Sequence, residues 1–379
     1  MRQWPKVALG DMLSRASETA VCAPDIEYDE VTIRLWGKGV ISRGKVRGAD
    51  VTTPRRVVRA NQLILSKIDA RNGAIGLVPE ELDGAIVSND FPSYAFVDRT
   101  RFDPAFMGWM VRSQHFVELC KAASEGTTNR VRIKEDRFLA QQIALPSLAE
   151  QHAIVSRLDT LADKARQLSE HLNAIECDTA RLLAARFRYA ITDTPMRPMA
   201  AVAPLVRREV AIDPQAHYTE LGIRSFYKGT FQRRTMDGVD YSWQNLFAVK
   251  AGDLIFSNIM AWEKAIAIAK PEDDGCVGNH RMLTCEVNVD TAVTSFLYYY
   301  FTTTEGFAKI DAASPGTAAR NKTLKAQDLM SIEVPIPSIS TQRSFDALQA
   351  KVATLKARHA TIRQANDALI PATLERVFN

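Results

Sequence analysis

Cysteine and histidine are scarce and scattered in this chain. The five cysteines form no Cys-x-x-Cys pair, and the six histidines show no ligand spacing with the cysteines or with each other. Zinc sites and disulfide frameworks need clusters of thiols and imidazoles at short, regular spacings. The sequence therefore predicts neither a metal site nor a disulfide framework, and we expect no cofactor.

Long apolar runs are also missing. No segment approaches the roughly 18 residues that a membrane span needs, and the start Met1–Pro5 lacks the apolar stretch of a secretory signal. We therefore expect the protein to stay in the cytoplasm. With 46% hydrophobic and 24% charged residues, the 379-residue chain has an ordinary globular composition and is long enough for two domains with cores of their own.

Known catalytic signatures are absent as well. No lysine has an acidic residue two positions before it, so the Asp/Glu-x-Lys element of a common metal-dependent nuclease site is missing. The chain has no Asn-Pro-Pro-aromatic or Asp-Pro-Pro-aromatic tetrapeptide, with which amino-methyltransferases hold a flipped base. It also lacks both glycine-rich phosphate-binding motifs. We predict that the chain is not an enzyme and that any catalysis belongs to a partner.

An internal repeat is the main feature that the sequence does have. The segment LILSKIDARNGAIGLVPEELDGAIV at 63–87 returns as LIFSNIMAWEKAIAIAKPEDDGCV at 254–277. Gln151 and Gln342 are separated by the same offset as the starts of these two segments. Two copies of one unit therefore fill the chain. Each copy begins with a mixed segment, in which short apolar runs alternate with tight turns, and ends with a long polar helix.

The start of each predicted helix is well marked. Ser147 and Glu150 form a Ser-x-x-Glu capping box directly after Pro146, whereas Thr341 replaces the glutamate in the second copy. The predicted fold class is α+β, with two mixed α/β domains that are separated and joined by two long helices in an antiparallel coiled coil. The expected boundaries are 1–146 and 193–337 for the domains, and 147–192 and 338–379 for the helices.

Apolar residues in both helices recur at alternating spacings of three and four, as in the seam of a coiled coil. His359 and Asn366 also fall on this seam, where polar groups commonly fix register or partner choice. In the alternative arrangements, each helix packs on its own domain or joins two copies of the chain. The predicted seam residues are Ile154, Leu158, Leu161, Leu168, Leu172, Ile175, Leu348, Val352, Leu355, Ile362 and Leu369.

Basic residues are concentrated in one part of each copy. Ten basic residues and only two acidic ones lie between Val31 and Arg71, although the whole chain has a net charge of only +4. Such a local excess of positive charge indicates a surface for a polyanion. In the second copy, Arg224 to Arg234 contains four basic and three aromatic residues and no acidic one.

A second basic cluster follows the Ser-x-Gly-Thr sequence of each copy, where glycine lets a backbone approach closely and Arg and Asn offer paired donors. A solvated surface charge is the competing interpretation for any one of these residues, but matching places in both copies favour binding for the groups. The candidate DNA-binding residues are Arg34, Trp36, Lys38, Arg43, Lys45, Arg47, Lys67, Arg71, Asn129, Arg130, Arg132, Arg224, Tyr227, Lys228, Arg233, Arg234, Arg320, Asn321, Lys322 and Lys325.

Three features resemble the DNA specificity subunit of type I restriction-modification systems. They are the duplicated plan, the Leu-Pro-x-x-x-Glu-Gln run at 145–151 before a heptad helix, and the Trp-x-x-Val-x-Leu-Gly start at 4–10. The segment at 64–73 is similar too, and the resemblance covers essentially the whole chain. It implies two target recognition domains that each read one half of a bipartite, asymmetric site in double-stranded DNA.

The resemblance also implies partners. Two methyltransferase subunits would dock on the antiparallel helices, which set the gap between the half-sites, and restriction subunits would complete the cleaving complex. The residues that correspond to the family's helix starts and docking regions are Leu145, Pro146, Glu150, Gln151, Ile336, Pro337 and Gln342. The competing interpretations are a specificity subunit of a type II-like system and a DNA-binding or inhibitor protein of the same complex that does not read sequence.

Overall fold

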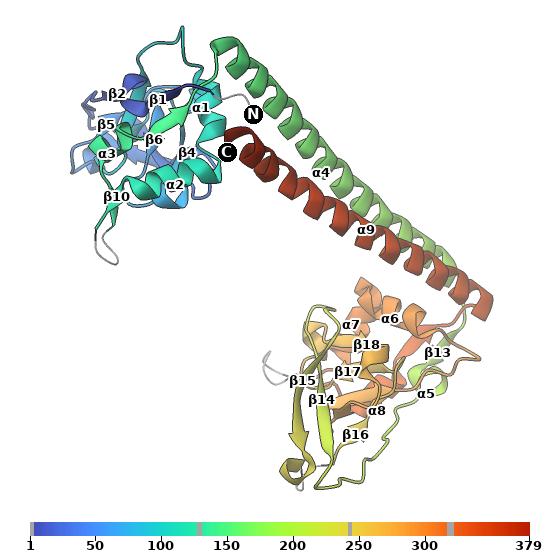
Figure 1. Ribbon diagram of the computed structural model, residues 1–379. Coiled ribbons are helices and arrows are strands. Elements are labelled where there is room, and N and C mark those ends of the chain that lie inside the picture. Colours follow the sequence, from blue (N-terminus) through green and yellow to red (C-terminus); the bar gives the residue numbers. More distant parts are fainter. Residues whose placement is uncertain (1–3, 127–130, 242–244, 317–321) are drawn as a thin grey trace. The chain divides into compact units, whose positions relative to one another are not determined.

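The computed structural model describes residues 4–126, 131–241, 245–316 and 322–379. The chain forms two units, one made of 1–173 with 359–379 and the other of 174–358. Both boundaries between the units fall inside the long helices α4 (Leu148–Ile191) and α9 (Ile339–Phe378) (Figure 1).

The strand-rich part of the first unit, which we call module 1, contains two four-stranded sheets in the orders β4-β3-β8-β5 and β2-β9-β6-β7. The strands are short and are separated by turns and single 3-10 turns, as expected for a segment with many glycines and prolines. Its helices are α1 (Pro104–Met110), α2 (Gln114–Ala122) and α3 (Glu135–Leu139). Its strands are β1 (Lys6–Ala8), β2 (Leu13–Ala16), β3 (Glu27–Ile33), β4 (Val40–Arg47), β5 (Arg56–Val57), β6 (Leu63–Leu65), β7 (Ile75–Leu77), β8 (Ile86–Val87), β9 (Ser93–Phe96), β10 (Ser124–Glu125), β11 (Arg132–Ile133) and β12 (Gln142–Ala144).

Module 2, the strand-rich part of the second unit, repeats this plan with sheets in the orders β15-β14-β19-β16 and β18-β17-β20. The pairing of β14 with β19 is parallel, as is that of β3 with β8 in module 1. Its helices are α5 (Met199–Val202), α6 (Thr294–Thr302), α7 (Thr304–Ala312) and α8 (Ala326–Ser331). Its strands are β13 (Met196–Pro198), β14 (His217–Ile223), β15 (Thr230–Asp237), β16 (Phe247–Ala248), β17 (Leu254–Ser257), β18 (Ile266–Ile268), β19 (Val277–Gly278), β20 (Met282–Cys285) and β21 (Glu333–Pro335).

The first and last strands of each module pair with each other. β1 runs antiparallel to β12, with Val7 opposite Ile143, and β13 runs antiparallel to β21, with Arg197 opposite Val334. The chain therefore enters each module beside the place where it leaves for the long helix.

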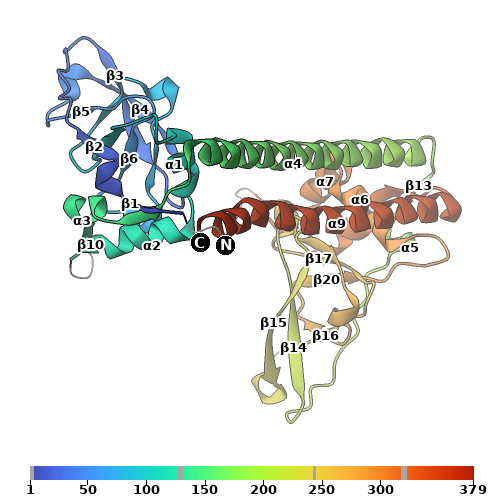
Figure 2. The same ribbon diagram turned by 45° about the horizontal axis from the view of Figure 1, so that its top comes forward.

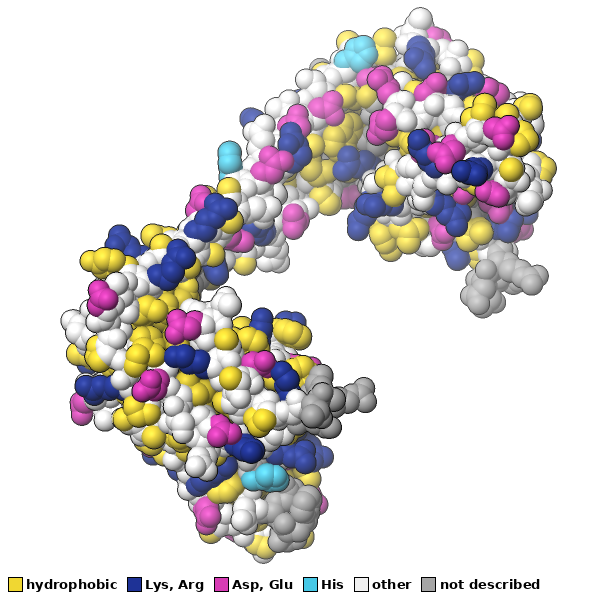
Figure 3. Space-filling model, turned by 180° about the vertical axis from the view of Figure 1, so that it is seen from behind, with side chains coloured by type: hydrophobic (Ala, Val, Ile, Leu, Met, Phe, Trp, Pro, Cys, Tyr) yellow, Lys and Arg dark blue, Asp and Glu magenta, His cyan; other side chains and the backbone are white. Residues whose placement is uncertain are grey.

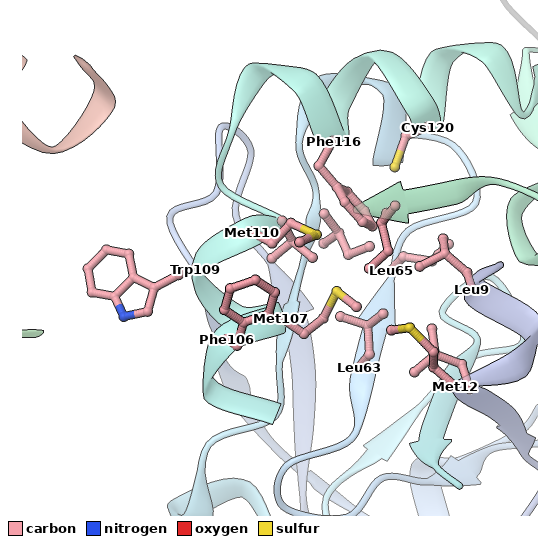
Figure 4. Packing of buried hydrophobic residues seen from close by; sticks show 14 of the residues in the cluster. Leu9, Met12, Leu63, Leu65, Phe106, Met107, Trp109, Met110, Phe116 and Cys120 are labelled. Atoms are coloured by element: carbon pink, nitrogen blue, oxygen red, sulfur yellow. The ribbon is translucent and has the colours of Figure 1, made fainter. Parts of the chain in front are cut away.

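The core of module 1 continues into the long helices. Figure 4 shows buried side chains of β6, α1 and α2 pointing toward one another, while Trp109 of α1 points away from the group. The Trp109 indole N–H donates a hydrogen bond of 2.8 Å to Asp159 of α4, and Phe378 of α9 packs against Phe106 with a ring separation of 5.4 Å. Both helices are therefore anchored to module 1 through α1.

The two long helices run antiparallel in each unit (Figures 1 and 2). In the first unit, the Asn366 side chain of α9 donates to the carbonyl of Ala165 at 2.9 Å and to the Ser169 hydroxyl at 3.0 Å. In the second unit, Phe187 of α4 packs on Phe345 of α9 with a ring separation of 5.2 Å. Residue numbers therefore rise along α4 while those of the contacting residues fall along α9, which is the antiparallel pairing that the sequence predicted.

The seam between the helices is narrower than the spacing predicted. Leu158, Leu172 and Val352 are buried, but four of the large apolar residues assigned to the seam lie at its edge. The helices instead approach each other on the side of the small residues Ala165 and Ser169, so the larger side chains turn outward. The four edge residues and their exposed fractions are Leu168 (37%), Ile175 (43%), Ile362 (41%) and Leu369 (39%).

The remaining seam residues are partly buried. Ile154 packs against the core of module 1 and Leu348 against that of module 2. Leu161 and Leu369 both line one surface groove of the first unit. We call the residues at this heptad position of α4 the outer stripe: Leu161, Leu168, Ile175, Leu182 and Tyr189.

Candidate nucleic-acid interface

Each module presents one long β-hairpin with basic residues on its second strand. β3 and β4 pair over their whole length with a register shift at Glu30, and β14 and β15 pair in the same way with a shift at Thr219. Such bulges increase the local twist of a strand. The side chains of Arg43, Lys45 and Arg47 on β4 and of Arg233 and Arg234 on β15 are exposed.

The loops that join these strands, 34–39 and 224–229, have the same backbone in both modules. Trp36 and Phe226 both have left-handed backbones, with φ angles of 62° and 61°. Their N–H groups donate to the carbonyls of Asn72 and Glu263, at 3.0 and 2.9 Å. A bulky residue rarely adopts this conformation unless its surroundings impose it. Each loop is therefore held in one shape by the turn that follows the β6 or β17 strand.

The next residue in each loop points inward. Gly37 donates to the carbonyl of Gly73, and a Cβ atom at Gly37 would lie 3.0 Å from Cγ of Arg112. Tyr227 takes the same backbone place, and its hydroxyl donates to the carbonyl of Phe301 at 2.8 Å. Burial raises the pKa of Tyr227 to about 12. Tyr227, which the sequence suggested for DNA contact, is therefore part of the support of the loop.

Phe226 is the exposed aromatic residue of the second loop, and sequence reasoning did not select it. Its side chain is 62% exposed, close to the 68% of Trp36. The repeat aligns Trp36 with Phe226, and this alignment was the available signal. Arg112, which the sequence also did not single out, packs beside the first loop at Gly37. Its guanidinium lies 4.2 Å from the centroid of the Trp109 ring, and burial lowers its pKa.

Several candidate cations are exposed and have no ion-pair partner among the described residues. Those of module 1 lie on β4 or in the loop before it, so they form a basic strip along one edge of the module. Lys228 holds its ammonium 5.9 Å from the centroid of Phe226 in module 2. The exposed candidates are Arg34, Lys38, Arg43, Lys45, Arg47, Lys228, Arg233 and Lys325. Arg71 is half-buried beside the module 1 loop.

Other candidate cations are held by the protein itself. Lys67 forms an ion pair of 2.9 Å with Glu135, a carboxylate that Arg15 also contacts. Such pairs neutralise much of the charge that a phosphate would meet. The other ion-paired cations and their partners are Arg132 with Asp90 (3.1 Å), Arg234 with Glu220 (3.4 Å) and Lys322 with Asp311 (2.6 Å). The exposed Arg224 donates to the neutral carbonyl of Thr230 at 2.6 Å and keeps its charge.

The clusters after the Ser-x-Gly-Thr sequences are only partly visible. Asn129, Arg130, Arg320 and Asn321 lie outside the described residues. Only Arg132, Lys322 and Lys325 of these two clusters are described.

A fully buried glutamine anchors the start of each long helix. The Gln151 amide donates to the carbonyls of Arg101 and Pro146, each at 2.9 Å, and its carbonyl accepts the N–H of Asp103 at 2.9 Å. Each polar atom of the side chain is thus used inside the protein. This geometry leaves Gln151 no surface for a partner and gives it the role of fixing α4 on module 1.

Gln342 repeats the arrangement in module 2. Its amide donates to the carbonyls of Thr291 and Pro337 at 3.0 and 2.9 Å, and its carbonyl accepts the N–H of Val293 at 2.9 Å. The preceding Leu145 and Ile336 are buried, so these helix starts face the interior.

The helix caps follow the sequence pattern. The Ser147 backbone N–H donates to Glu150 at 3.2 Å, and the Glu150 N–H donates to the Ser147 hydroxyl at 3.4 Å, which completes the predicted capping box. In the second helix the Thr341 N–H donates to the Ser338 hydroxyl at 3.2 Å. Thr341 therefore keeps one half of the box, and its hydroxyl pairs with Ser338 in place of a carboxylate.

The described residues contain no group of three or more His, Cys, Asp or Glu side chains that could hold a metal ion. Within the same ranges, none of the helices has the length and apolar character needed to cross a membrane. Burial raises the pKa of Cys120 and Cys285 to about 12, so these thiols stay protonated as core residues.

Comparison with known proteins gives matches among solved structures only. No protein-family model and no curated protein matches the chain. The HsdS subunit from Thermoanaerobacter tengcongensis superposes with a TM-score of 0.65 at 18% identity, over 100% of this chain and 97% of that one. A chain of a type I restriction-modification system, solved in work on its complex assembly and conformational transition, gives a TM-score of 0.69 at 19% identity, over 100% and 98%. The chain therefore has the fold of the HsdS specificity subunits of type I restriction-modification systems.

Proposed function

We propose that this protein is the DNA specificity subunit of a type I restriction-modification complex. The observation that carries the proposal is the repeated basic hairpin, which each module presents on a frame with the same hydrogen bonds. Exposed Arg and Lys along a strand suit the phosphates that dominate DNA affinity, and a two-stranded ribbon fits the major groove. The HsdS fold supports the same conclusion.

The two modules would read different half-sites of one asymmetric target. Their frames agree in the bonds of the loop backbone and of the buried glutamine. Their exposed residues differ: Trp36 corresponds to Phe226 in the repeat, and Lys45 and Arg47 of β4 correspond to Thr235 and Asp237 of β15. Conserved frames position a protein on DNA, whereas the side chains at base edges select sequence.

The long helices would set the gap between the half-sites and dock two methyltransferase subunits. A helix rises about 1.5 Å per residue, so the 44-residue α4 is about 66 Å long, more than one turn of DNA. Its outer stripe leaves Ile175, Leu182 and Tyr189 43%, 46% and 79% exposed. Hydrophobic side chains are visible between the charged ones along the helices in Figure 3. Such a stripe suits a partner helix.

In this complex the chain contributes recognition and assembly. The methyltransferase subunits would supply the methyl transfer, and restriction subunits would supply cleavage. The lack of nuclease and methyltransferase motifs in the sequence supports this division.

The decisive test is selection from random DNA. The full chain, bound to its methyltransferase subunits, is incubated with a library of random duplexes, and the retained DNA is sequenced. We expect one motif with two specified halves, a fixed unspecified gap and different sequences in the two halves. If no sequence motif is enriched and the DNA affinity falls steeply with salt, the protein binds DNA without reading its sequence.

Docking on the outer stripe gives a second prediction. Replacing Ile175 and Leu182 by lysine places two charges on the apolar face, so we expect at least about tenfold weaker binding of the methyltransferase subunit, since burying an unpaired charge costs several kcal/mol. Titration calorimetry or light scattering measures this binding. The matched control, Asn173→Lys with Ala180→Lys, adds the same charge at other exposed positions of α4. Equal binding by both variants argues against the stripe as the docking face.

A further inference from the structure

We propose that Trp36 and Phe226 are the base-stacking contacts of the two modules, each on its own half-site. The inference rests on the proposed function and deepens it, because it names the side chains that contact bases among residues that otherwise suit phosphates. Aromatic rings stack on base faces, and in a duplex a ring reaches a face by wedging between two base steps and partly unstacking them.

The backbone directs both rings outward. In each loop the residue after the aromatic one is held inward, either by Arg112 packed on Gly37 or by the Tyr227 hydroxyl bond to Phe301. The aromatic residue itself adopts a left-handed backbone that its N–H bond to the neighbouring turn maintains. The same strained backbone conformation occurs in both modules, and in both it holds an aromatic ring in solvent. This repetition points to a contact that the ring makes with another molecule.

The cations beside the two rings favour nucleic acid over protein as the molecule that the rings contact. Arg34 and Lys38 lie two positions before and after Trp36, and Arg224 and Lys228 flank Phe226 in the same way. The centres of protein interfaces are depleted of lysine, whereas an aromatic ring between cations is the composition of a surface that stacks bases and holds their phosphates. The exposed cations of β4 continue from Trp36 along the same hairpin.

The two rings also differ in size. Indole covers more of a base face than phenyl does, so Trp36 would stack more strongly than Phe226 in the equivalent place. The inference therefore assigns one aromatic residue to each half of the target.

The test uses the random-duplex selection with the full chain and its methyltransferase subunits. Trp36→Ala is expected to weaken binding of the selected duplex about tenfold and to relax base preference in one half only, and Phe226→Ala to do so in the other half. The slope of affinity against salt should stay unchanged, because no phosphate contact is lost. Trp36→Phe should restore most of the affinity. Val97→Ala and Val239→Ala, which shorten similarly exposed side chains in the two modules, are the controls.

A spectroscopic measurement reports stacking directly. Binding of the selected duplex should quench tryptophan fluorescence in the wild type, and Trp36→Phe should remove most of that quenching. If the wild type enriches a two-part motif and both alanine variants keep its affinity and sequence, the inference is wrong and the proposed function stands. If the variants bind DNA normally but lose the methyltransferase subunit, the rings contact protein and the inference is also overturned. Failure of the wild type to enrich any motif contradicts the proposed function itself.

Discussion

Replacing Gln151 by alanine is expected to lower the free energy of unfolding of the first unit by about 4 kcal/mol, the largest effect that we predict for a single substitution. The change leaves the N–H of Asp103 and the carbonyls of Arg101 and Pro146 without the fully buried side chain that pairs with them. Each unsatisfied buried group costs about 1–3 kcal/mol, and the lost side chain leaves a cavity as well.

Hydrogen–deuterium exchange of individual amides shows where in the chain this stability is lost. Exchange of the Asp103 amide should accelerate about 1000-fold, because its exchange depends on the free energy of local opening. Gln342→Ala should have the same effect at Val293 in the second unit. The matched controls are Gln167→Ala on α4 and Gln327→Ala on α8, one exposed glutamine in each unit. Exchange of Asp103 at the wild-type rate in Gln151→Ala would show that the glutamine does not fix the helix start.

Reversing the charge of Arg34 and Lys38 together is expected to weaken DNA binding about 100-fold at moderate salt. Both side chains are exposed, belong to the loop of the first hairpin and have no ion-pair partner among the described residues. A reversed charge removes one phosphate contact and adds repulsion, so the slope of log affinity against log salt should also become shallower by about two.

The binding measurement is a salt titration on the selected duplex, with fluorescence anisotropy as the signal. Arg99→Glu with Lys351→Glu changes the net charge equally at exposed positions outside the hairpins and serves as the control. An equal loss in both variants would mean that net charge, not the hairpin, determines affinity. Unchanged binding of the hairpin variant would exclude Arg34 and Lys38 from the interface.

Local signals predicted the long helices well. The capping box at Ser147 and the proline before it mark a start that the structure places at Leu148, and the repeat transfers that start to Ile339 despite Thr341. Helix starts depend on a few neighbouring residues, so a sequence pattern contains most of what determines them.

Contacts between distant residues could not be predicted in the same way. Lys67 belongs to the basic segment by composition, but its partner Glu135 comes from α3 and was not visible as a neighbour. Phe226 and Tyr227 are adjacent aromatic residues that look equivalent in the sequence. Both have left-handed backbones, but the Phe226 side chain is exposed whereas the Tyr227 hydroxyl bonds to Phe301 inside the module. The predicted helix seam differs from the observed one, because apolar spacing alone does not show that the Ser169 hydroxyl accepts a hydrogen bond from Asn366.

The strand pairs that close each module have an evolutionary consequence. Because β1 lies beside β12 and β13 beside β21, the two ends of each module leave from neighbouring strands. A segment with adjacent ends can be exchanged as a cassette without disturbing what flanks it. A single recombination event with crossovers at these strands would install a new hairpin on unchanged helices. Under the proposed function, such an exchange would replace one half of the recognition surface in a single step.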